Sequence, residues 1–199
     1  MIEMQTRIEN LLVVKIGGGE GLDMARCIDD LARLAAERPL IVVHGVSAAM
    51  NALCAERGIE VRTITSPTGH SSRYTDPQTR DVFVEAANRV NGELVAGLQA
   101  RGVNAAGITG GHAVLRGERK AAIRALVDGR IRMIRDDYSG TINGVNVKAL
   151  LDALANGSIP VVPPYALSDD GALNVDGDRA SAAIAGALSA EELVILSNV

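Results

Sequence analysis

The stretch from Leu11 to Ile16 is apolar apart from Lys15, and it runs directly into the glycines Gly17 to Gly19. A short continuous apolar run of this kind is typical of a strand buried on both faces. Such strands occur mainly in parallel sheets that are covered by helices. The start of the chain therefore predicts a buried parallel strand that ends in a glycine turn.

The same strand-then-helix pattern recurs along the chain. Further buried strands are predicted at Leu40–Val43, Val103–Ile108, Ile159–Val162 and Leu193–Ser197. Helices are predicted at Leu22–Glu37, Asn146–Ala155 and Asp178–Leu188, one helix is predicted to follow a Ser47 cap, and another to run from an Asp76 cap through Pro77 to Ala100. This alternation predicts an α/β fold, a three-layer α/β/α sandwich with a mostly parallel central sheet. In such sheets the ligand lies at the carboxyl ends of the strands. Residues 113–135 depart from the pattern, because short β-like runs around Asp128-Gly129 predict a β-hairpin excursion.

Composition narrows the classes of function. Apolar residues make up 47% of the 199 residues and aromatic residues 2%, so the core is expected to consist of Val, Ile, Leu, Ala and Met. The net charge of −4 argues against a nucleic-acid partner, since phosphate backbones need clustered Lys and Arg. No apolar run is long enough for a membrane span, and the polar N-terminus does not resemble a signal peptide. Cys27 and Cys54 are expected to be reduced core residues, which favours a cytoplasmic location.

Lys15 and the glycines beside it form the first candidate site. Glycines let backbone amides approach an anion closely, and the following helix adds a positive N-terminal dipole, so Gly17 and Gly18 with the Lys15 charge could bind a phosphate. The spacing is not that of a Walker loop. An ordinary strand-to-helix turn, with a lysine whose ammonium reaches solvent, explains the same residues.

A second turn, His44-Gly45-Val46-Ser47, follows the next strand, and two such turns at neighbouring strand ends would face one pocket. His44 taken alone is more often a structural residue at a strand end than a catalyst. Arg73 stands just before a predicted helix, where its guanidinium could fork onto a carboxylate or lie in solvent.

The segment from Asn174 to Asp178 places an amide and two carboxylates at the start of a helix. Asp176 or Asp178 could cap that helix. The twelve-residue pattern of a calcium loop is missing, and we assign no metal ligands. A carboxylate here could instead orient lysines around a transferring phosphoryl group.

Seven basic residues lie in the interval from Arg116 to Arg135, against two acidic ones, in a chain whose net charge is negative. They are Arg116, Arg119, Lys120, Arg124, Arg130, Arg132 and Arg135. A charge run is usually a solvated face. This one opposes the sign of the whole chain, so an acidic partner is a second hypothesis.

Together these segments resemble the amino acid kinase family, in its acetylglutamate kinase branch, over all 199 residues. The matching stretches are Lys15-Ile16-Gly17-Gly18, Val43-His44-Gly45, Ser72-Arg73-Tyr74-Thr75, Gly157 to Val162 and Leu173 to Asp178. Within that branch the chain is most similar to the kinases that phosphorylate α-aminoadipate, or glutamate, attached to an acidic amino-group carrier protein. That likeness rests on His44 to Ala48, Arg116 to Lys120 and Asp137 to Thr141.

The resemblance implies a phosphotransferase of lysine or arginine biosynthesis that uses ATP and Mg²⁺ to convert a side-chain carboxylate into an acyl phosphate. Lys15 and Asp178 would be catalytic: Lys15 would stabilise charge on the phosphoryl group, and Asp178 would organise the lysines. Gly17 and Gly18 would contact the phosphate. The substrate would be held by Gly45, Val46, Ser47, Arg73 and Asn174. Positioning and electrostatics would do most of the work, because a carboxylate is already a nucleophile toward phosphorus.

The resemblance also implies two partners. Arg116, Arg119 and Lys120 would contact the acidic carrier, and the helix from Pro77 to Ala100 would form a homodimer. Two alternatives stay open: an N-acetylglutamate kinase that acts on the free small molecule, and a non-catalytic regulatory relative that binds an amino acid.

Two departures from the family are visible. Val46 stands where the family usually has a glycine, and a β-branched residue is expected to fit a positive φ poorly and to crowd an anion. The family's C-terminal part, which holds the nucleotide and a second lysine, would follow Val199. We therefore expect residues 1–199 to be the substrate-binding part of a single domain that is truncated after an apolar strand, with little kinase activity by itself.

Overall fold

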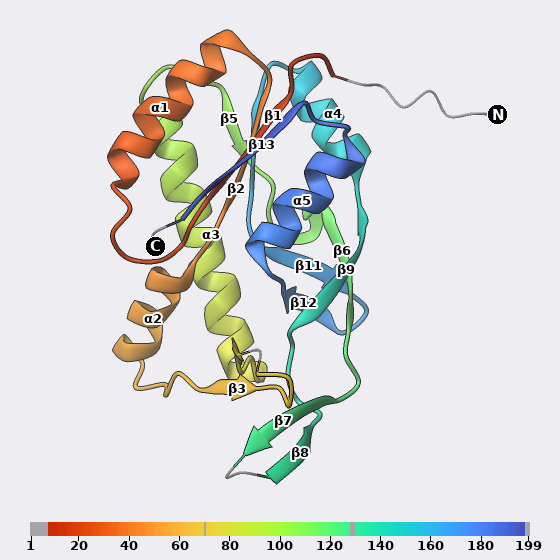
Figure 1. Cartoon of the computed structure of the whole chain (residues 1–199). Helices are drawn as coiled ribbons and strands as arrows, with labels where there is room; N and C mark the ends of the chain where they lie inside the picture. Colours follow the sequence, from red (N-terminus) through yellow and green to blue (C-terminus); the bar gives the residue numbers. More distant parts are fainter. Residues whose placement is uncertain (1–7, 70, 128–129, 198–199) are drawn as a thin grey trace, which may run out of the picture.

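The computed structural model describes residues 8–69, 71–127 and 130–197, and a five-stranded parallel sheet forms its centre (Figure 1). Its strands are β1 (Leu12–Ile16), β2 (Leu40–His44), β5 (Ala105–Gly107), β10 (Ile159–Val162) and β13 (Glu192–Leu196), in the spatial order β13-β1-β2-β10-β5. Each neighbouring pair runs parallel. These are the strands that the apolar runs predicted, so the central sheet is confirmed.

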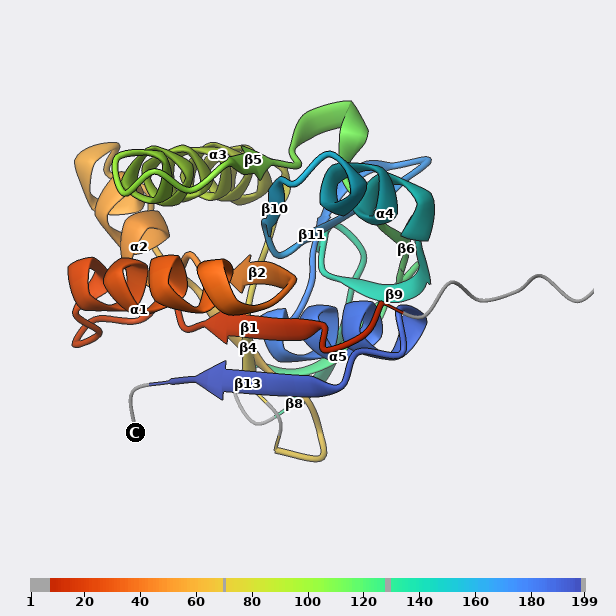
Figure 2. The same cartoon turned by 90° about the horizontal axis from the view of Figure 1, so that it is seen from above.

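Alternate residues of the central strands face opposite sides of the sheet and build two apolar cores. Leu12, Val14 and Ile16 pack with side chains from α1 (Met24–Glu37) and α3 (Pro77–Gln99). Leu11 and Val13 pack on the other face, with side chains from α4 (Val147–Ala155) and α5 (Gly177–Ala187). Figure 2 shows the two helical layers on either side of the strands, which confirms the three-layer arrangement.

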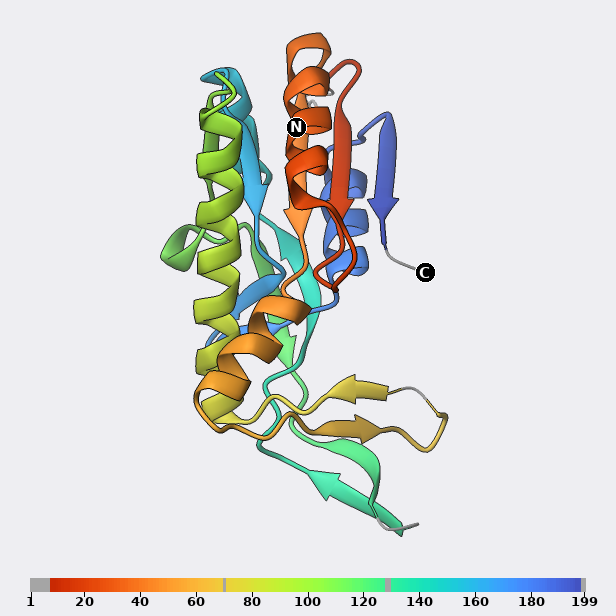
Figure 3. The same cartoon turned by 90° about the vertical axis from the view of Figure 1, so that its left-hand side faces the viewer.

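Two further four-stranded sheets adjoin the central one. The first has the order β12-β11-β6-β9, formed by β6 (Leu115–Arg119), β9 (Gly140–Val145), β11 (Tyr165–Ser168) and β12 (Gly171–Asn174). The second has the order β4-β3-β7-β8, formed by β3 (Thr63–Thr65), β4 (Ser71–Arg73), β7 (Ile123–Val127) and β8 (Arg130–Ile134). Figure 3 shows the second sheet at the end of the molecule where the central strands terminate.

The predicted hairpin excursion is present, and part of the interval also contributes a strand to another sheet. β7 and β8 pair antiparallel as predicted, while β6 leaves the excursion to pair with β9. The predicted Asp128-Gly129 turn lies outside the described residues. The β3–β4 hairpin was missed because each strand has only three residues, too few to show a period.

The predicted helix cap is present at α3 but not at α2. Asp76 caps α3 as predicted, with its carboxylate accepting from the Thr79 N–H at 2.8 Å and Pro77 in the first position. Ser47 is not the cap of α2 (Ser47–Glu56); it is the first helical residue, and Val46 occupies the cap position without a side-chain hydrogen bond. A 3₁₀ turn, η1 (Gly110–His112), follows β5. Within the described part of the chain, no helix has the length and apolarity needed to cross a bilayer.

Asp76→Ala should destabilise the fold, because it removes the cap of the longest helix and the ion pair of Asp76 with Arg62, whose atoms are 2.5 Å apart. Loss of a capping carboxylate costs about 1 to 2 kcal/mol in the free energy of unfolding. Urea denaturation at pH 7 measures this loss. Gln78→Ala, an exposed change in the same helical turn, is the control and should stay within about 0.5 kcal/mol of the parent. Equal effects of the two changes would contradict the capping role.

Candidate active site

A cavity of about 840 Å³ opens at the carboxyl ends of β1 and β2. Its walls come from those strand ends, from β3, β4 and β7 of the hairpins, and from β9, β12 and the start of α5. The predicted residues that line it are Lys15, Gly18, Gly45, Val46, Ser47, Arg73, Lys120, Asn174 and Asp178. Gly17, Arg116 and Arg119 were also predicted and are not among its lining residues. Segments far apart in sequence thus converge at the strand ends, as parallel α/β sheets require.

Lys15 and Asp178 form an ion pair inside this cavity. The Lys15 Nζ lies 2.8 Å from the Asp178 Oδ1, with the lysine side chain 11% exposed and the aspartate 54% exposed. Asp176 is the residue that caps α5, accepting from the Arg179 N–H at 2.8 Å. The capping task is therefore separate from Asp178, which is free to orient the lysine. A Cβ at Gly177 would lie 3.4 Å from the Lys15 Cε, at ordinary van der Waals contact, so the ion pair does not require a glycine there.

The two glycine turns touch through their backbones. A Cβ on Gly18 would lie 2.1 Å from the Val46 nitrogen, and a Cβ on Gly45 would lie 2.4 Å from the Gly18 nitrogen. No side chain fits at either position, so both residues must be glycine for the turns to meet. The Ala48 N–H, in the first turn of α2, donates to the Gly18 carbonyl at 2.6 Å. The positive end of the α2 dipole is thereby held at the cavity wall.

Val46 does not have the backbone conformation that we expected to be unfavourable. Its φ is −139°, far from the left-handed region, so a β-branched residue is accommodated without strain. Its side chain is 6% exposed and belongs to the apolar cluster of Met50 and Phe83. The expectation of a strained turn is wrong for this residue, because the turn is formed with a negative φ.

His44 is buried behind the second turn. Its Nδ1 lies 3.2 Å from the Gly45 carbonyl, and its Nε2 lies 3.2 Å from the Asn91 Nδ2, which also donates to the Val161 carbonyl at 2.9 Å. A neutral imidazole that donates from Nδ1 and accepts at Nε2 satisfies both contacts. Burial lowers the pKa of His44 to about 4, against the smaller opposing effect of the Gly45 hydrogen bond. His44 therefore stays neutral at physiological pH and supports the turn from behind.

Arg73 lines the cavity, and one of its guanidinium nitrogens is buried without a partner among the described residues. Its Nη2 donates to the Asn51 Oδ1 at 2.5 Å, while its Nη1 is buried and has no hydrogen-bond partner among the described residues. Burial lowers the pKa of Arg73, although an arginine keeps its charge in a protein. A buried donor without a partner costs free energy, and the guanidinium to which it belongs lies at the cavity wall, where a ligand carboxylate could pair with it.

Asn174 faces the same cavity from the end of β12. Its Nδ2 donates to the Thr75 Oγ1 at 3.1 Å, which orients the amide and leaves its oxygen as an acceptor. The segment from Asp137 to Ser139 contacts both Thr75 and Asn174, and sequence reasoning assigned it no site role. Its polar residues lie in an irregular connection, which has no hydrophobic periodicity that could identify them from the sequence.

The seven basic residues lie in three kinds of surroundings. Lys120 and Arg124 line the cavity, while Arg116, Arg130, Arg132 and Arg135 are exposed elsewhere. Arg119, predicted to contact a partner, is instead largely occupied within the chain: it donates to the Asp137 carbonyl at 2.9 Å and stacks 4.1 Å from the Tyr138 ring centroid. Its side chain is 17% exposed.

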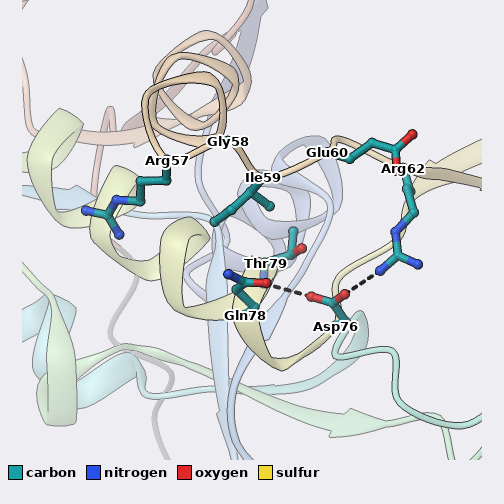
Figure 4. A pocket seen from close by; sticks show the side chains of 8 residues that line it. All are labelled: Arg57, Gly58, Ile59, Glu60, Arg62, Asp76, Gln78 and Thr79. Carbon is teal, nitrogen blue, oxygen red and sulfur yellow. Dashed lines mark hydrogen bonds and ion pairs between the residues drawn. The ribbon is translucent and has the colours of Figure 1, made fainter.

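A smaller hollow of about 240 Å³ lies where the end of α2 meets the start of α3 (Figure 4). Its arginines are already paired, Arg57 with Glu85 and Arg62 with Asp76, each at 2.5 Å. None of the predicted site residues lies there. Among the described residues, no group of three or more His, Cys, Asp or Glu side chains is arranged to hold a metal ion.

A mostly buried lysine beside interlocked glycine turns and helix starts, at the strand ends of a parallel sheet, is an arrangement with which α/β proteins bind anions. Residues 10–199 match the amino acid kinase family, and the chain belongs to that family. It is 42% identical over 197 residues to the [LysW]-aminoadipate kinase of Deinococcus radiodurans, covering 97% of this chain and 68% of that protein. It is 41% identical over 194 residues to the [LysW]-aminoadipate kinase of Thermus thermophilus, covering 95% of this chain and 72% of that one.

The fold is also found among solved structures. The crystal structure of smu.665 from Streptococcus mutans superposes with a TM-score of 0.73 at 24% sequence identity, covering 96% of this chain and 73% of that one. This likeness supports the mostly parallel α/β architecture described above.

The burial of His44 should make the protein less stable in mild acid. The folded pKa of about 4 lies below the unfolded value of about 6.5, so the unfolded state binds the proton first as the pH falls. The stabilisation that depends on a neutral His44 is present above pH 6.5 and is lost toward pH 4. Between pH 7 and pH 5 this loss lowers the free energy of unfolding by about 2 kcal/mol. Urea denaturation at both pH values measures the change.

Two variants isolate the contribution of this one group. In His44→Gln the loss between pH 7 and pH 5 should shrink by about 2 kcal/mol, whatever the absolute stability of the variant. His112→Gln, at an exposed histidine, should keep the parent's pH dependence. A His44→Gln variant with an unchanged slope would show that His44 titrates normally in the folded state.

Proposed function

We propose that this protein phosphorylates the side-chain carboxylate of 2-aminoadipate, or of glutamate, while that amino acid is attached to an acidic amino-group carrier protein. ATP would be the phosphoryl donor and an acyl phosphate the product, in lysine or arginine biosynthesis. The observation that carries this proposal is that one cavity joins Lys15 and Asp178 to Arg73 and Asn174, and extends to Lys120 and Arg124 near the hairpin. The names of the relatives from Deinococcus and Thermus, both [LysW]-aminoadipate kinases, agree with it.

The reacting end of the cavity would be the interlocked glycine turns. The phosphoryl group supplied by ATP carries negative charge, and the Lys15 ammonium, 2.8 Å from the Asp178 carboxylate, is held where that charge would develop. An ammonium has three donors, so Lys15 can bond a phosphoryl oxygen while still bonding Asp178. The start of α2 at Ser47 adds the positive end of a helix dipole.

The acceptor's fixed end would lie at Arg73 and Asn174. The guanidinium of Arg73 would receive a carboxylate, and the amide oxygen of Asn174 would accept an N–H from the amide that links the substrate to its carrier. These contacts hold the substrate without reacting, so the distal carboxylate is left to face Lys15. The arrangement lowers the barrier mainly by orientation, since the nucleophile is already anionic.

The carrier would dock on the basic strands β6, β7 and β8. Arg116, Lys120, Arg124, Arg130 and Arg132 are exposed and would attract an acidic surface. Arg119, bonded to the Asp137 carbonyl, would support these strands from within as well as add charge. The cavity reaches Lys120 and Arg124, so an amino acid tethered to a docked carrier could extend from the hairpin toward Lys15.

Three further features belong to the same proposal. Mg²⁺ would be bound chiefly by the phosphate oxygens of the donor, as is usual for this ion. A homodimer would use the solvent-facing side of α3, which is polar with small residues at Gly92 and Ala96. The protein would act in the cytoplasm, where its two free cysteines, Cys27 and Cys54, stay reduced.

The direct test is a phosphorylation assay on the full-length gene product with ATP and Mg²⁺. Free N-acetylglutamate, carrier-bound glutamate and carrier-bound aminoadipate are offered side by side, and acyl phosphate is trapped with hydroxylamine. We expect turnover with at least one carrier-bound acceptor and a KM at least tenfold higher for the free molecule, because docking adds a second binding site. Preference for free N-acetylglutamate would overturn the proposed carrier dependence.

Charge reversal on β6 and β8 tests the docking surface. Arg116→Glu/Arg132→Glu should raise the KM for the carrier-bound acceptor about tenfold at low ionic strength, and less at 0.5 M salt, where charges are screened. Both residues lie outside the cavity, so the kinetics with free N-acetylglutamate should not change. Arg33→Glu/Lys148→Glu reverses two exposed charges on α1 and α4 and is the matched control. Equal effects of the two double variants would exclude this surface as the docking site.

A further inference from the structure

Asp137 is a buried carboxylate at the centre of the walls that carry Arg73 and Asn174. It lies in the connection between β8 and β9 and is 1% exposed. Its Oδ2 accepts from the Thr75 N–H at 2.9 Å, and its Oδ1 accepts from the Ser139 N–H at 2.7 Å and from the Ser139 hydroxyl. In the described part of the chain, no Lys or Arg side chain forms an ion pair with it. A buried carboxylate costs free energy unless its oxygens accept hydrogen bonds. The Thr75 and Ser139 donors therefore stabilise the Asp137 carboxylate, and the carboxylate in turn fixes the positions of these donors.

Thr75 connects Asp137 to the residues that face the substrate. It is fully buried, and its hydroxyl donates to the Arg73 carbonyl at 3.3 Å while accepting from the Asn174 Nδ2 at 3.1 Å. One side chain therefore contacts both halves of the proposed acceptor site. The position of that hydroxyl depends on the Thr75 backbone, which is bonded to Asp137.

The residues next to Asp137 strengthen the same link. The Tyr138 N–H donates to the Thr75 carbonyl at 2.7 Å, and the Asn174 N–H donates to the Tyr138 carbonyl at 2.9 Å. The ends of β4 and β12 are thus joined through one short segment rather than by direct strand pairing. The Arg119 Nε fixes that segment from the outside, by donating to the Asp137 carbonyl at 2.9 Å.

We propose that Asp137 is a positioning residue for the acceptor: through Thr75 it sets the separation and orientation of Arg73 and Asn174. This inference rests on the proposed function, because it assigns Arg73 and Asn174 to the substrate's fixed end. Asp137 itself touches no reacting atom. Its influence should therefore fall on acceptor binding rather than on the phosphoryl-transfer step or on ATP.

The test is steady-state kinetics of Asp137→Asn in the full-length gene product, with calorimetric binding of the acceptor alongside. The amide keeps the shape but turns one accepting oxygen into a donor that opposes an N–H group. We expect the KM and the Kd for the acceptor to rise about tenfold, the factor that corresponds to one lost hydrogen bond to a charged group. The KM for ATP should not change, and kcat should stay within about twofold.

Further variants separate positioning from a purely structural role. Thr75→Val keeps the backbone N–H that bonds Asp137 but removes the hydroxyl, and should show the same rise in acceptor KM even if Asp137→Asn folds poorly. Asp152→Asn, at an exposed aspartate paired with Lys148, is the matched control. A lower kcat with unchanged KM values in both Asp137→Asn and Thr75→Val would mean a loss of folded protein, and would overturn the positioning role.

The outcomes for the parent protein keep the two proposals apart. If the parent binds and phosphorylates an acceptor and the Asp137→Asn and Thr75→Val variants match it, only the role of Asp137 is overturned. If the parent neither binds nor phosphorylates any acceptor, the proposed function is wrong, and the role of Asp137 is wrong with it.

Discussion

The backbone contact between Gly18 and Gly45 is the constraint on which the rest of the site depends. A Cβ at either residue would lie within 2.4 Å of the opposite backbone, so the two turns meet only because neither carries a side chain. Their contact places the end of β1, and with it Lys15, beside the start of α2. The parallel pairing of β1 with β2 fixes the same alignment of the two strand ends within the sheet, with Lys15 opposite Val43 and Ile16 opposite His44. Sheet register and turn chemistry thus specify one geometry together.

The parts of this arrangement that depend on local pattern could be predicted from the sequence. Apolar runs such as Leu40–Val43 identify strands because both faces are buried, and Asp76-Pro77 identifies a helix start because cap and first-turn preferences are local. Strand ends in a parallel sheet share one edge, so the convergence of Lys15 with the turn at Gly45, at the ends of β1 and β2, followed from topology. Their chemical roles came from the family resemblance, since the residues themselves left several interpretations open.

The parts that depend on tertiary contact could not be predicted. Asp137 and Thr75 meet across 62 positions in the sequence, and nothing local distinguishes Asp137 from an exposed loop carboxylate. Arg119 looks like its basic neighbours in sequence, yet in the fold it stacks on the Tyr138 ring and donates to nearby carbonyls. The φ of Val46 was misjudged for the same reason, because its side chain joins an apolar cluster that exists only in the folded chain.

The unequal exposure of Lys15 and Asp178 bears on how such a site could work. The lysine is 11% exposed and the aspartate 54%, so the ammonium has lost most of its hydration while its partner has kept much of it. A half-solvated carboxylate contributes only modest stabilisation, since water screens it. It still fixes the direction of one ammonium proton and leaves two donors available. An anion that enters the cavity would meet a cation that is already desolvated and aligned, so little reorganisation would remain when negative charge develops there.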